Sequence, residues 1–138
     1  MLDLADLEAY YHYKLMCPNN PIGPVDVYNV SVHGQDKGIS DVLDHAVGAR
    51  VALMGNGPRK GGSLKAWRTL KTAPGLQDIW MSHYSVDNTK EDNPPPDFIA
   101  NPEIDCQWKT IKLSARQDGS FTVTNGRNGF SKSYPPRR

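Results

Sequence analysis

Three short apolar segments, separated by stretches of helical character, constrain the fold of this chain most. They are Val25–Val32, Arg50–Met54 and Ile79–Tyr84, and each is bounded by residues typical of turns. Their β-branched and aromatic side chains favour buried strands. Because the connections between them carry a helical pattern, the sequence predicts an α/β fold with a mainly parallel βαβαβ sheet and right-handed crossovers.

Both connections contain the signals of a short helix. In the first, Asp41 is the predicted N-cap, and Asp44 is expected to reach back in the manner of a capping box. In the second, Ser63 is the predicted N-cap. Three apolar residues of this second helix recur at helical spacing, so we expect them to face the sheet. They are Leu64, Trp67 and Leu70.

The remaining segments predict a loop, a hairpin and a terminal strand. Residues 85–105 contain three consecutive prolines, so we expect a long Pro-rich surface loop there. Two alternating segments, 108–114 and 120–124, predict a C-terminal β-hairpin, and residues 130–134 are a candidate edge strand. Residues 2–7 also alternate between apolar and polar side chains. We favour a strand for them, although the segment also suits the start of a helix.

Composition and charge exclude several classes of function. The 138 residues are the size of one domain, and 16 Lys and Arg against 15 Asp and Glu leave a net charge of +1. Such a balance gives no reason to expect nucleic acid as a partner. No apolar run approaches the roughly 18 residues that a membrane span requires, and no signal peptide is recognisable. We therefore expect neither a membrane nor a nucleic-acid partner, and the localisation stays open.

Four histidines and two cysteines carry the most obvious chemical potential. His33 directly follows a predicted parallel strand, and His83 lies near the end of another. Ligands and catalytic groups of open α/β sheets gather at the carboxyl ends of strands, so these two histidines are the more informative. Cys17 and Cys106 fit no metal-binding spacing; one disulfide is compatible with the sequence, but we expect two buried free thiols. The other two histidines are His12 and His45, of which the second is expected at the surface.

A glycine-rich loop, residues 55–63, connects a predicted strand to a predicted helix and carries Arg59 and Lys60. Backbone N–H groups in such a loop can bind an anion. The Walker pattern requires Gly-Lys-Ser/Thr, whereas here Lys60 precedes two glycines. A tight turn is therefore the favoured interpretation, with anion binding as the alternative.

The segment VDVYNVSVHGQDKGISDVLDHAVGARVALMGNGPRKGGS, residues 25–63, resembles the C-terminal half of metallo-β-lactamase-fold hydrolases. The similar branch contains the hydrolase domain of competence DNA-uptake proteins, in which a strand delivers a His-His-Gly loop, a helix follows, and the next strand leads into an Asn-Gly turn. The upstream LDLADL is similar to the strand with the family's Gly-Asp-Leu motif, and SFTVTNGRNGFSKSY is similar to its terminal hairpin. The resemblance implies that residues 1–138 form one truncated domain, half of an αββα sandwich.

The resemblance also implies a set of site residues. Asp6 matches the metal-bridging aspartate, with Ala5 in place of the family's glycine, and His33 matches one histidine of the His-His-Gly loop, with Val32 in place of the other. The His-x-His-x-Asp-His module that supplies most metal ligands in the family does not occur in this sequence. We expect His33 to ligate a metal and Asp6 to ligate or act as a base. The residues expected to complete the site are His12, Asp36 and His83.

The activity that the resemblance implies is hydrolysis of small activated esters, phosphoesters above all. The water would be activated by Zn²⁺ or, without metal, by an acid–base pair. A half-sandwich would expose an apolar sheet face, so we expect a homodimer or higher oligomer that completes the site. The alternative is a non-catalytic oligomeric fragment or interaction module. Since Met1 falls where an intact family member is in mid-sheet, an internal start, a truncated gene or an excised fragment would each account for the chain.

Overall fold

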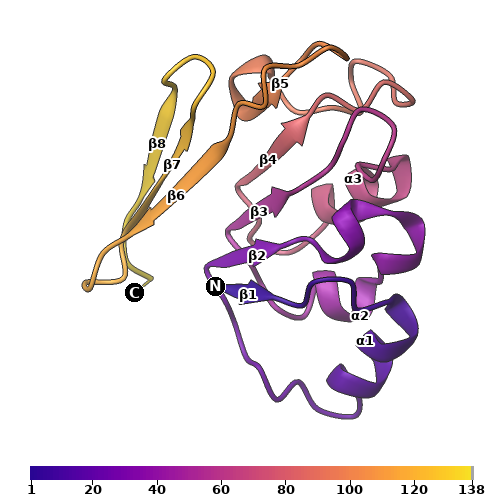
Figure 1. The fold of residues 1–138 in the computed structure, drawn as a ribbon. Helices are drawn as coiled ribbons and strands as arrows, with labels where there is room; N and C mark the ends of the chain where they lie inside the picture. Colours follow the sequence, from indigo (N-terminus) through magenta and orange to yellow (C-terminus); the bar gives the residue numbers. More distant parts are fainter. Residues whose placement is uncertain (138) are drawn as a thin grey trace.

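The computed structural model of the protein describes residues 1–137 and contains two sheets and three helices (Figure 1). The strands of the five-stranded parallel sheet follow one another in space in the order of the chain. They are β1 (Leu2–Asp3), β2 (Val27–Asn29), β3 (Val51–Met54), β4 (Asp78–His83) and β5 (Ile99–Asn101). A separate antiparallel sheet contains β6 (Ile111–Ala115), β7 (Phe121–Asn125) and β8 (Ser131–Tyr134). The α/β class, the parallel sheet and the C-terminal hairpin are thus confirmed.

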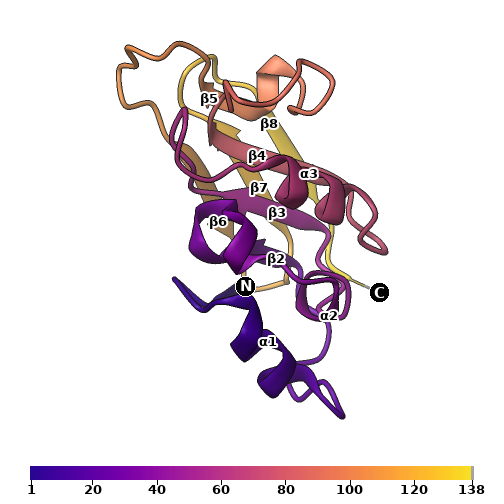
Figure 2. The same ribbon diagram turned by 90° about the vertical axis from the view of Figure 1, so that its right-hand side faces the viewer.

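The helices all cover the same face of the parallel sheet. They are α1 (Ala9–Met16), α2 (Asp41–Asp44) and α3 (Leu64–Lys71), and Figures 1 and 2 show them on the side opposite β6–β8. Parallel strands added in chain order through crossovers of one hand place every connecting helix on one face. The opposite face remains free for the antiparallel sheet, so the chain forms three layers.

Side chains of the parallel sheet alternate between two buried cores. Toward the helices, Tyr28, Ala52 and Ile79 are paired in register and pack with apolar residues of α2 and α3. Toward the antiparallel sheet, Val27, Val51 and Trp80 are buried. The partners of this second core on β7 and β8 are Phe121, Val123 and Tyr134. The period of two along each strand therefore supplies both cores from the same short segments.

The expectation of an exposed apolar sheet face is wrong for this parallel sheet, because the chain's own antiparallel sheet covers it. Trp80 Nε1 donates a hydrogen bond to Tyr134 Oη over 3.1 Å, and Tyr134 Oη donates to Asp78 Oδ2 over 2.7 Å. The rings of Phe121 and Tyr134 stack with centroids 4.7 Å apart. Thr122 and Thr124 on β7 bond to serine hydroxyls of β8, so polar groups line the side of this sheet that faces away from the core.

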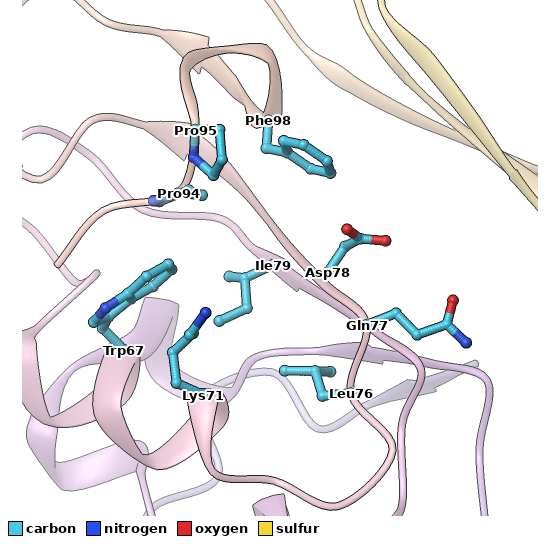
Figure 3. Close-up of a pocket in the computed structure, with 9 residues that line it drawn as sticks. All are labelled: Trp67, Lys71, Leu76, Gln77, Asp78, Ile79, Pro94, Pro95 and Phe98. Carbon is cyan, nitrogen blue, oxygen red and sulfur yellow. The ribbon is translucent and has the colours of Figure 1, made fainter. Parts of the chain in front are cut away.

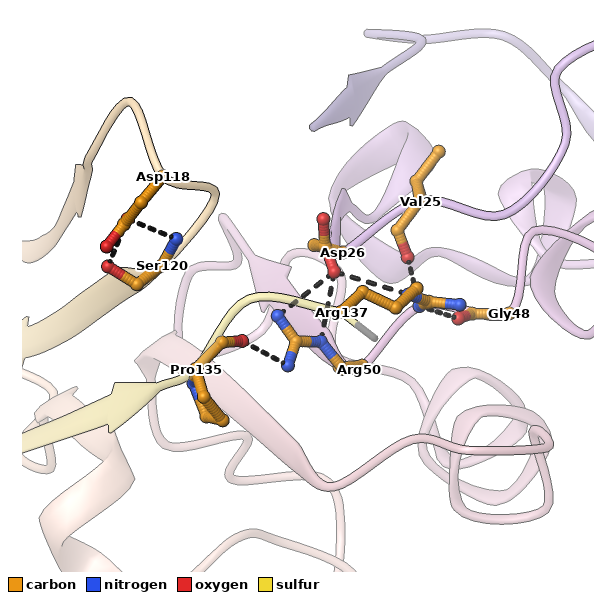
Figure 4. Close-up of polar contacts among 8 residues, drawn as sticks. All are labelled: Val25, Asp26, Gly48, Arg50, Asp118, Ser120, Pro135 and Arg137. Atoms are coloured by element: carbon orange, nitrogen blue, oxygen red, sulfur yellow. Dashed lines mark hydrogen bonds and ion pairs between the residues drawn. The ribbon is translucent and has the colours of Figure 1, made fainter.

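The end of the chain is tied to the amino-terminal ends of β2 and β3 (Figure 4). Arg137 Nη2 donates to the carbonyl oxygens of Val25 and Gly48, at 2.9 and 2.8 Å. Arg137 Nε and Arg50 Nε both donate to Asp26 Oδ1. Arg50 Nη1 donates to the Pro135 carbonyl over 2.7 Å. These contacts fix β8, and with it the antiparallel sheet, to the parallel one.

The first two predicted elements are shifted or shortened in the structure. Only residues 27–29 of the predicted strand Val25–Val32 are strand, because the chain enters a left-handed turn, Ser31–Gly34, just after it. The N-cap of α2 is Ser40 rather than Asp41: its Oγ accepts from Leu43 N at 3.4 Å. Asp44 Oδ2 accepts from Ser40 N at 2.9 Å, so the predicted reciprocal bond exists with a cap one residue earlier. Of the predicted strand at residues 2–7 only Leu2–Asp3 is strand, and the first hairpin strand covers Ile111–Ala115 rather than residues 108–114. Strands β3 and β4 and the Ser63 cap agree with the predictions.

Four further expectations differ from the structure. The predicted loop 85–105 contains a 3₁₀ turn, Pro96–Phe98, and β5, whose three residues are all buried against β4. Helix α1 has no counterpart among the predicted elements. Leu64 is 38% exposed rather than turned inward. Cys17 and Cys106 are free thiols, as expected, but Cys17 is exposed and Cys106 is only half-buried.

None of the helices within residues 1–137 is long and apolar enough to cross a membrane.

Candidate functional site at the carboxyl ends of the parallel strands

Five polar side chains follow or end the parallel strands, one for each strand. In strand order they are Asp6, His33, Asn56, His83 and Asn101. Because all five strands run in one direction, their carboxyl ends meet at a single edge of the sheet. Open parallel sheets bind ligands at this edge, which makes it the first place to seek a site.

The turn that carries His33 has an unusual backbone. Val32, His33 and Gly34 have φ values of 50°, 58° and 73°, so three consecutive residues are left-handed. A β-branched residue rarely adopts this conformation, because its Cβ approaches the backbone too closely. Backbone hydrogen bonds hold the turn: Val32 N donates to Ala5 O, Gly62 N to His33 O, and Ser63 N to Gly34 O, all within 3.0 Å.

The glycine-rich loop explains how the strained turn is accommodated. A Cβ added to Gly61 would lie 1.9 Å from the His33 carbonyl oxygen, and one added to Gly38 would lie 2.6 Å from Val32 Cβ. Gly57 N donates to Lys60 O over 2.8 Å, which is the expected tight turn. Because they lack a Cβ, the glycines at positions 61 and 38 allow the backbone to pack closely against His33 and Val32. Arg59, one of the two cations that suggested anion binding, is paired with Asp87 at 2.7 Å.

His33 and Asp6 are brought together from the ends of β2 and β1. His33 Nδ1 bonds to the Gly55 carbonyl oxygen at 2.9 Å. Since a carbonyl only accepts, Nδ1 donates this bond, and in the neutral ring Nε2 then carries the lone pair. Nε2 lies 3.7 Å from Asp6 Oδ1, and the two side chains are 39% and 76% exposed. The pair is open to solvent.

The other expected site residues are engaged elsewhere or are not bonded to this pair. His12 is fully buried and uses both ring nitrogens, Nδ1 with Ser40 Oγ and Nε2 with Leu7 O, each at 2.9 Å. Burial lowers the pKa of His12. Asp36 is exposed, and its backbone carbonyl accepts from Lys65 Nζ. His83 is 3% exposed and bonds through Nδ1 to Tyr84 O. His45 is half-buried and bonds to Thr69 O at 3.0 Å.

The pair Asp6–His33 fits two ligands of a zinc ion. With metal–ligand bonds near 2.1 Å and tetrahedral angles, a nitrogen and an oxygen on one ion are about 3.4 Å apart. The separation of 3.7 Å between His33 Nε2 and Asp6 Oδ1 is close to this value. Within residues 1–137, however, no three His, Cys, Asp or Glu side chains form a group that could hold a metal ion. One chain thus supplies at most two protein ligands at this place.

A buried carboxyl group on α2 was singled out from the sequence only as part of a helix cap. Asp44 is 1% exposed, Oδ2 accepts from Ser40 N, and Oδ1 has no hydrogen-bond partner among residues 1–137. Burial raises the pKa of Asp44 to about 6. Tyr28, also buried, donates to Ser31 Oγ at 3.0 Å, and burial raises its pKa as well. The cap pattern that marked Asp44 in the sequence does not reveal that the carboxyl group is buried.

A small cavity of about 230 Å³ lies between α3 and the proline segment (Figure 3). Trp67, Ile79 and Phe98 give it apolar walls. Its carboxylate, Asp78, is already bonded to Tyr134 and paired with Lys132 at 2.6 Å. The Asp78 carboxylate is therefore already engaged within the protein, and the other polar side chains that line the cavity are Lys71 and Gln77.

Comparison with protein-family models, with curated proteins and with solved structures finds no significant match to this chain. A functional interpretation therefore rests on the residues themselves and on the sequence resemblance described above.

Proposed function

We propose that this chain is related to the C-terminal half of metallo-β-lactamase-fold hydrolases and hydrolyses small activated esters, phosphoesters above all. The observation that carries the proposal is the exposed pair of His33 Nε2 and Asp6 Oδ1, 3.7 Å apart at the carboxyl edge of the sheet. These are the two residues that the resemblance assigns to the site, and they come from different strands. The strained turn at His33 adds support, because such strain concentrates at functional sites.

The pair has the geometry of a base and its supporting carboxylate. The bond from Nδ1 to Gly55 O fixes the ring, so Nε2 is free to accept a proton from water. At 3.7 Å, Nε2 and Asp6 Oδ1 are too far apart for a direct hydrogen bond, yet one water can bond to both. After the proton transfer, Asp6 would stabilise the imidazolium. A zinc ion bound by the same two atoms would lower the pKa of its water to about 7.

A second copy of the chain would complete the ligand set. Catalytic zinc sites have three protein ligands as a rule, and one chain offers two here. Two exposed pairs that face each other across a two-fold axis would bring four ligands together. Light scattering should then show a dimer or larger species at micromolar concentration, and a folded 15.3 kDa monomer would contradict this part of the proposal.

The hydrolase proposal is tested with p-nitrophenyl phosphate and p-nitrophenyl acetate. His33→Ala and Asp6→Ala should each lower kcat/KM by about 100-fold or more, the usual contribution of a positioned base. His45→Gln and Asp105→Ala change the same residue types away from the pair and should leave activity unchanged. Loss of activity with a chelator and recovery with Zn²⁺ would identify the metal-dependent form. Activity that survives both substitutions and chelation would refute the site.

The alternative, a non-catalytic interaction module, is favoured by one feature of α1. Tyr10, Tyr11 and Tyr13 are 64%, 51% and 53% exposed, and Lys14 lies over the Tyr10 ring at 4.5 Å. Exposed aromatic side chains are enriched at protein interfaces. If no ester is hydrolysed by any form of the protein, and Tyr10→Ser with Tyr13→Ser abolishes self-association, the interaction module is the better interpretation.

A further inference from the structure

The cavity between α3 and the proline segment lies at the start of β4, away from the carboxyl ends of the strands (Figure 3). Neither Asp6 nor His33 lines it, so it is distinct from the pair on which the proposed hydrolase activity rests. Its volume is about 230 Å³. An apolar cavity of roughly 150 Å³ already accommodates benzene, whereas sites for drug-sized ligands begin at about 300 Å³. The size therefore suits a ligand with a single six-membered ring.

Flat apolar side chains form two walls and the floor of this cavity. In Figure 3, Trp67 of α3 lies on one side and Phe98 on the other, with Ile79 of β4 between them. Trp67 and Ile79 are only 8% and 4% exposed, so the cavity reaches the edge of the core. The Phe98 ring is held by Trp80 and Phe130, with ring centroids 4.6 and 5.3 Å away. Such walls favour an aromatic ring, which packs on them through edge or offset contacts.

Pro94 and Pro95 form a third wall, which is held in place by a buried asparagine. Asn93 Nδ2 donates to the carbonyl oxygens of Ser85 and Thr89, at 3.1 and 3.0 Å. Asn93 Oδ1 accepts from Ser85 N at 2.9 Å. The two prolines therefore keep their position before any ligand arrives, which lowers the entropic cost of binding.

Of the two charged side chains that line the cavity, Lys71 is the one without a carboxylate partner. Figure 3 shows the Lys71 side chain pointing from α3 into the space between Trp67 and Ile79. Lys71 Nζ lies 5.4 Å from the centroid of the Trp67 ring, which fixes its place at the cavity. It forms no ion pair within the described part of the chain. A negative group on a ligand whose ring lies against Trp67 is therefore within reach of Nζ.

The other charged side chain, Asp78, offers a cation no free charge. Asp78 Oδ2 accepts from Tyr134 Oη at 2.7 Å and is paired with Lys132 Nζ at 2.6 Å. In Figure 3 its carboxylate points away from Trp67 and Lys71. Because Lys132 neutralises Asp78 and Lys71 has no partner, the charges at the cavity favour an anion over a cation.

We propose that this cavity binds a small carboxylate that carries one aromatic ring. The ring packs between Trp67 and Phe98 against Ile79, and the carboxylate pairs with Lys71 Nζ. The volume leaves no room for a second fused ring. This binding is independent of the proposed hydrolase activity.

The probe is benzoate, and an NMR titration follows its binding to the protein. The Trp67 indole N–H resonance should shift and saturate, with a Kd of about 1 mM or tighter for a ligand of this size. The ring protons of benzoate should show nuclear Overhauser effects to the Ile79 methyl groups. Acetate carries the charge without the ring and should cause no saturable shift. Benzamide carries the ring without the charge and should bind about threefold more weakly, as expected for an exposed ion pair.

Lys71→Gln tests the charge, because the side chain is exposed and its loss leaves the core intact. This variant should bind benzoate and benzamide equally. Lys14→Gln is the matched control: Lys14 is also in the last turn of its helix and lies over the Tyr10 ring at 4.5 Å, but it does not line the cavity. His33→Ala should bind benzoate as wild type does. Absence of a saturable shift, absence of contacts to Ile79, or a preference for benzoate that survives in Lys71→Gln would overturn the proposal.

Discussion

Gly61 lies so close to His33 that a Cβ at position 61 would be 1.9 Å from the His33 carbonyl oxygen. The φ of Gly61 is also left-handed, at 77°. Both facts exclude a larger residue, and together they make the loop from β3 to α3 part of the support for the His33 turn. The loop from β3 to α3 thus supports the His33 turn through a backbone contact at Gly61, and no side chain of the loop takes part in that contact.

Substitution of Gly61 tests this coupling. Gly61→Ala should lower the free energy of unfolding by about 2 kcal/mol or more, because the left-handed backbone and the clash with His33 O both oppose a side chain. Chemical denaturation measures the change. Gly55→Ala is the control, since a Cβ there meets nothing within 4 Å and its carbonyl still accepts from His33 Nδ1. Equal stabilities of the two variants would contradict the coupling.

Asp44 should make stability decrease as pH rises. Its pKa is about 6 in the folded protein against an ordinary value of 3.8, so between these values the folded state keeps a proton that the unfolded state has lost. The resulting loss of stability is roughly 3 kcal/mol and is complete a little above pH 6. Asp44→Asn should abolish this component. Urea denaturation from pH 4 to 8 gives the free energy of unfolding of wild type and variant. The difference between the two isolates the contribution of Asp44 from that of His12, whose lowered pKa changes stability in the opposite direction.

Tyr134 should contribute to stability through its hydroxyl group. Tyr134→Phe keeps the stacked ring but removes the bonds to Trp80 Nε1 and Asp78 Oδ2. Because Trp80 Nε1 is buried and loses its acceptor, we expect a loss of about 1–3 kcal/mol in thermal or chemical denaturation. Tyr13→Phe, at an exposed position of α1, should change stability by less than about 0.5 kcal/mol. A neutral Tyr134→Phe variant would mean that the Tyr134 hydroxyl contributes nothing to the attachment of the antiparallel sheet.

Arg137 should stabilise the contact between the chain end and β2. Arg137→Ala removes the hydrogen bonds to Val25 O, Gly48 O and Asp26. The side chain of Arg137 is 38% exposed, so solvent screens its charge, and we expect a modest loss of about 1 kcal/mol. Arg116→Ala, whose side chain is exposed on the turn between β6 and β7, serves as the reference in the same denaturation experiment.

Elements whose signal is local could be predicted from the sequence, and those that depend on distant contacts could not. Strands β3 and β4 and the hairpin β6–β7 have their own apolar pattern, whereas β5 has three residues inside a proline-rich stretch and is buried only because β4 pairs with it. Helix α1 was missed because its tyrosines are exposed and interrupt the apolar period. The left-handed Val32 is imposed by Ala5 and Gly38, contacts that no local pattern reveals.

The candidate site could be predicted in part. Asp6 and His33 came from the resemblance, and the structure brings these two side chains together. His12 was a reasonable candidate by residue type, yet both of its nitrogens are used within the protein.

The order of strands in the parallel sheet has a consequence for synthesis on the ribosome. Each of β2 to β5 pairs with the strand made just before it, so the sheet and its helices can assemble in the order in which the chain emerges. Val27, Val51 and Trp80 must wait for β7 and β8 to cover them. Until β7 and β8 leave the tunnel, the nascent protein presents this apolar surface to chaperones and to other nascent chains, and loss of β8 would make that exposure permanent.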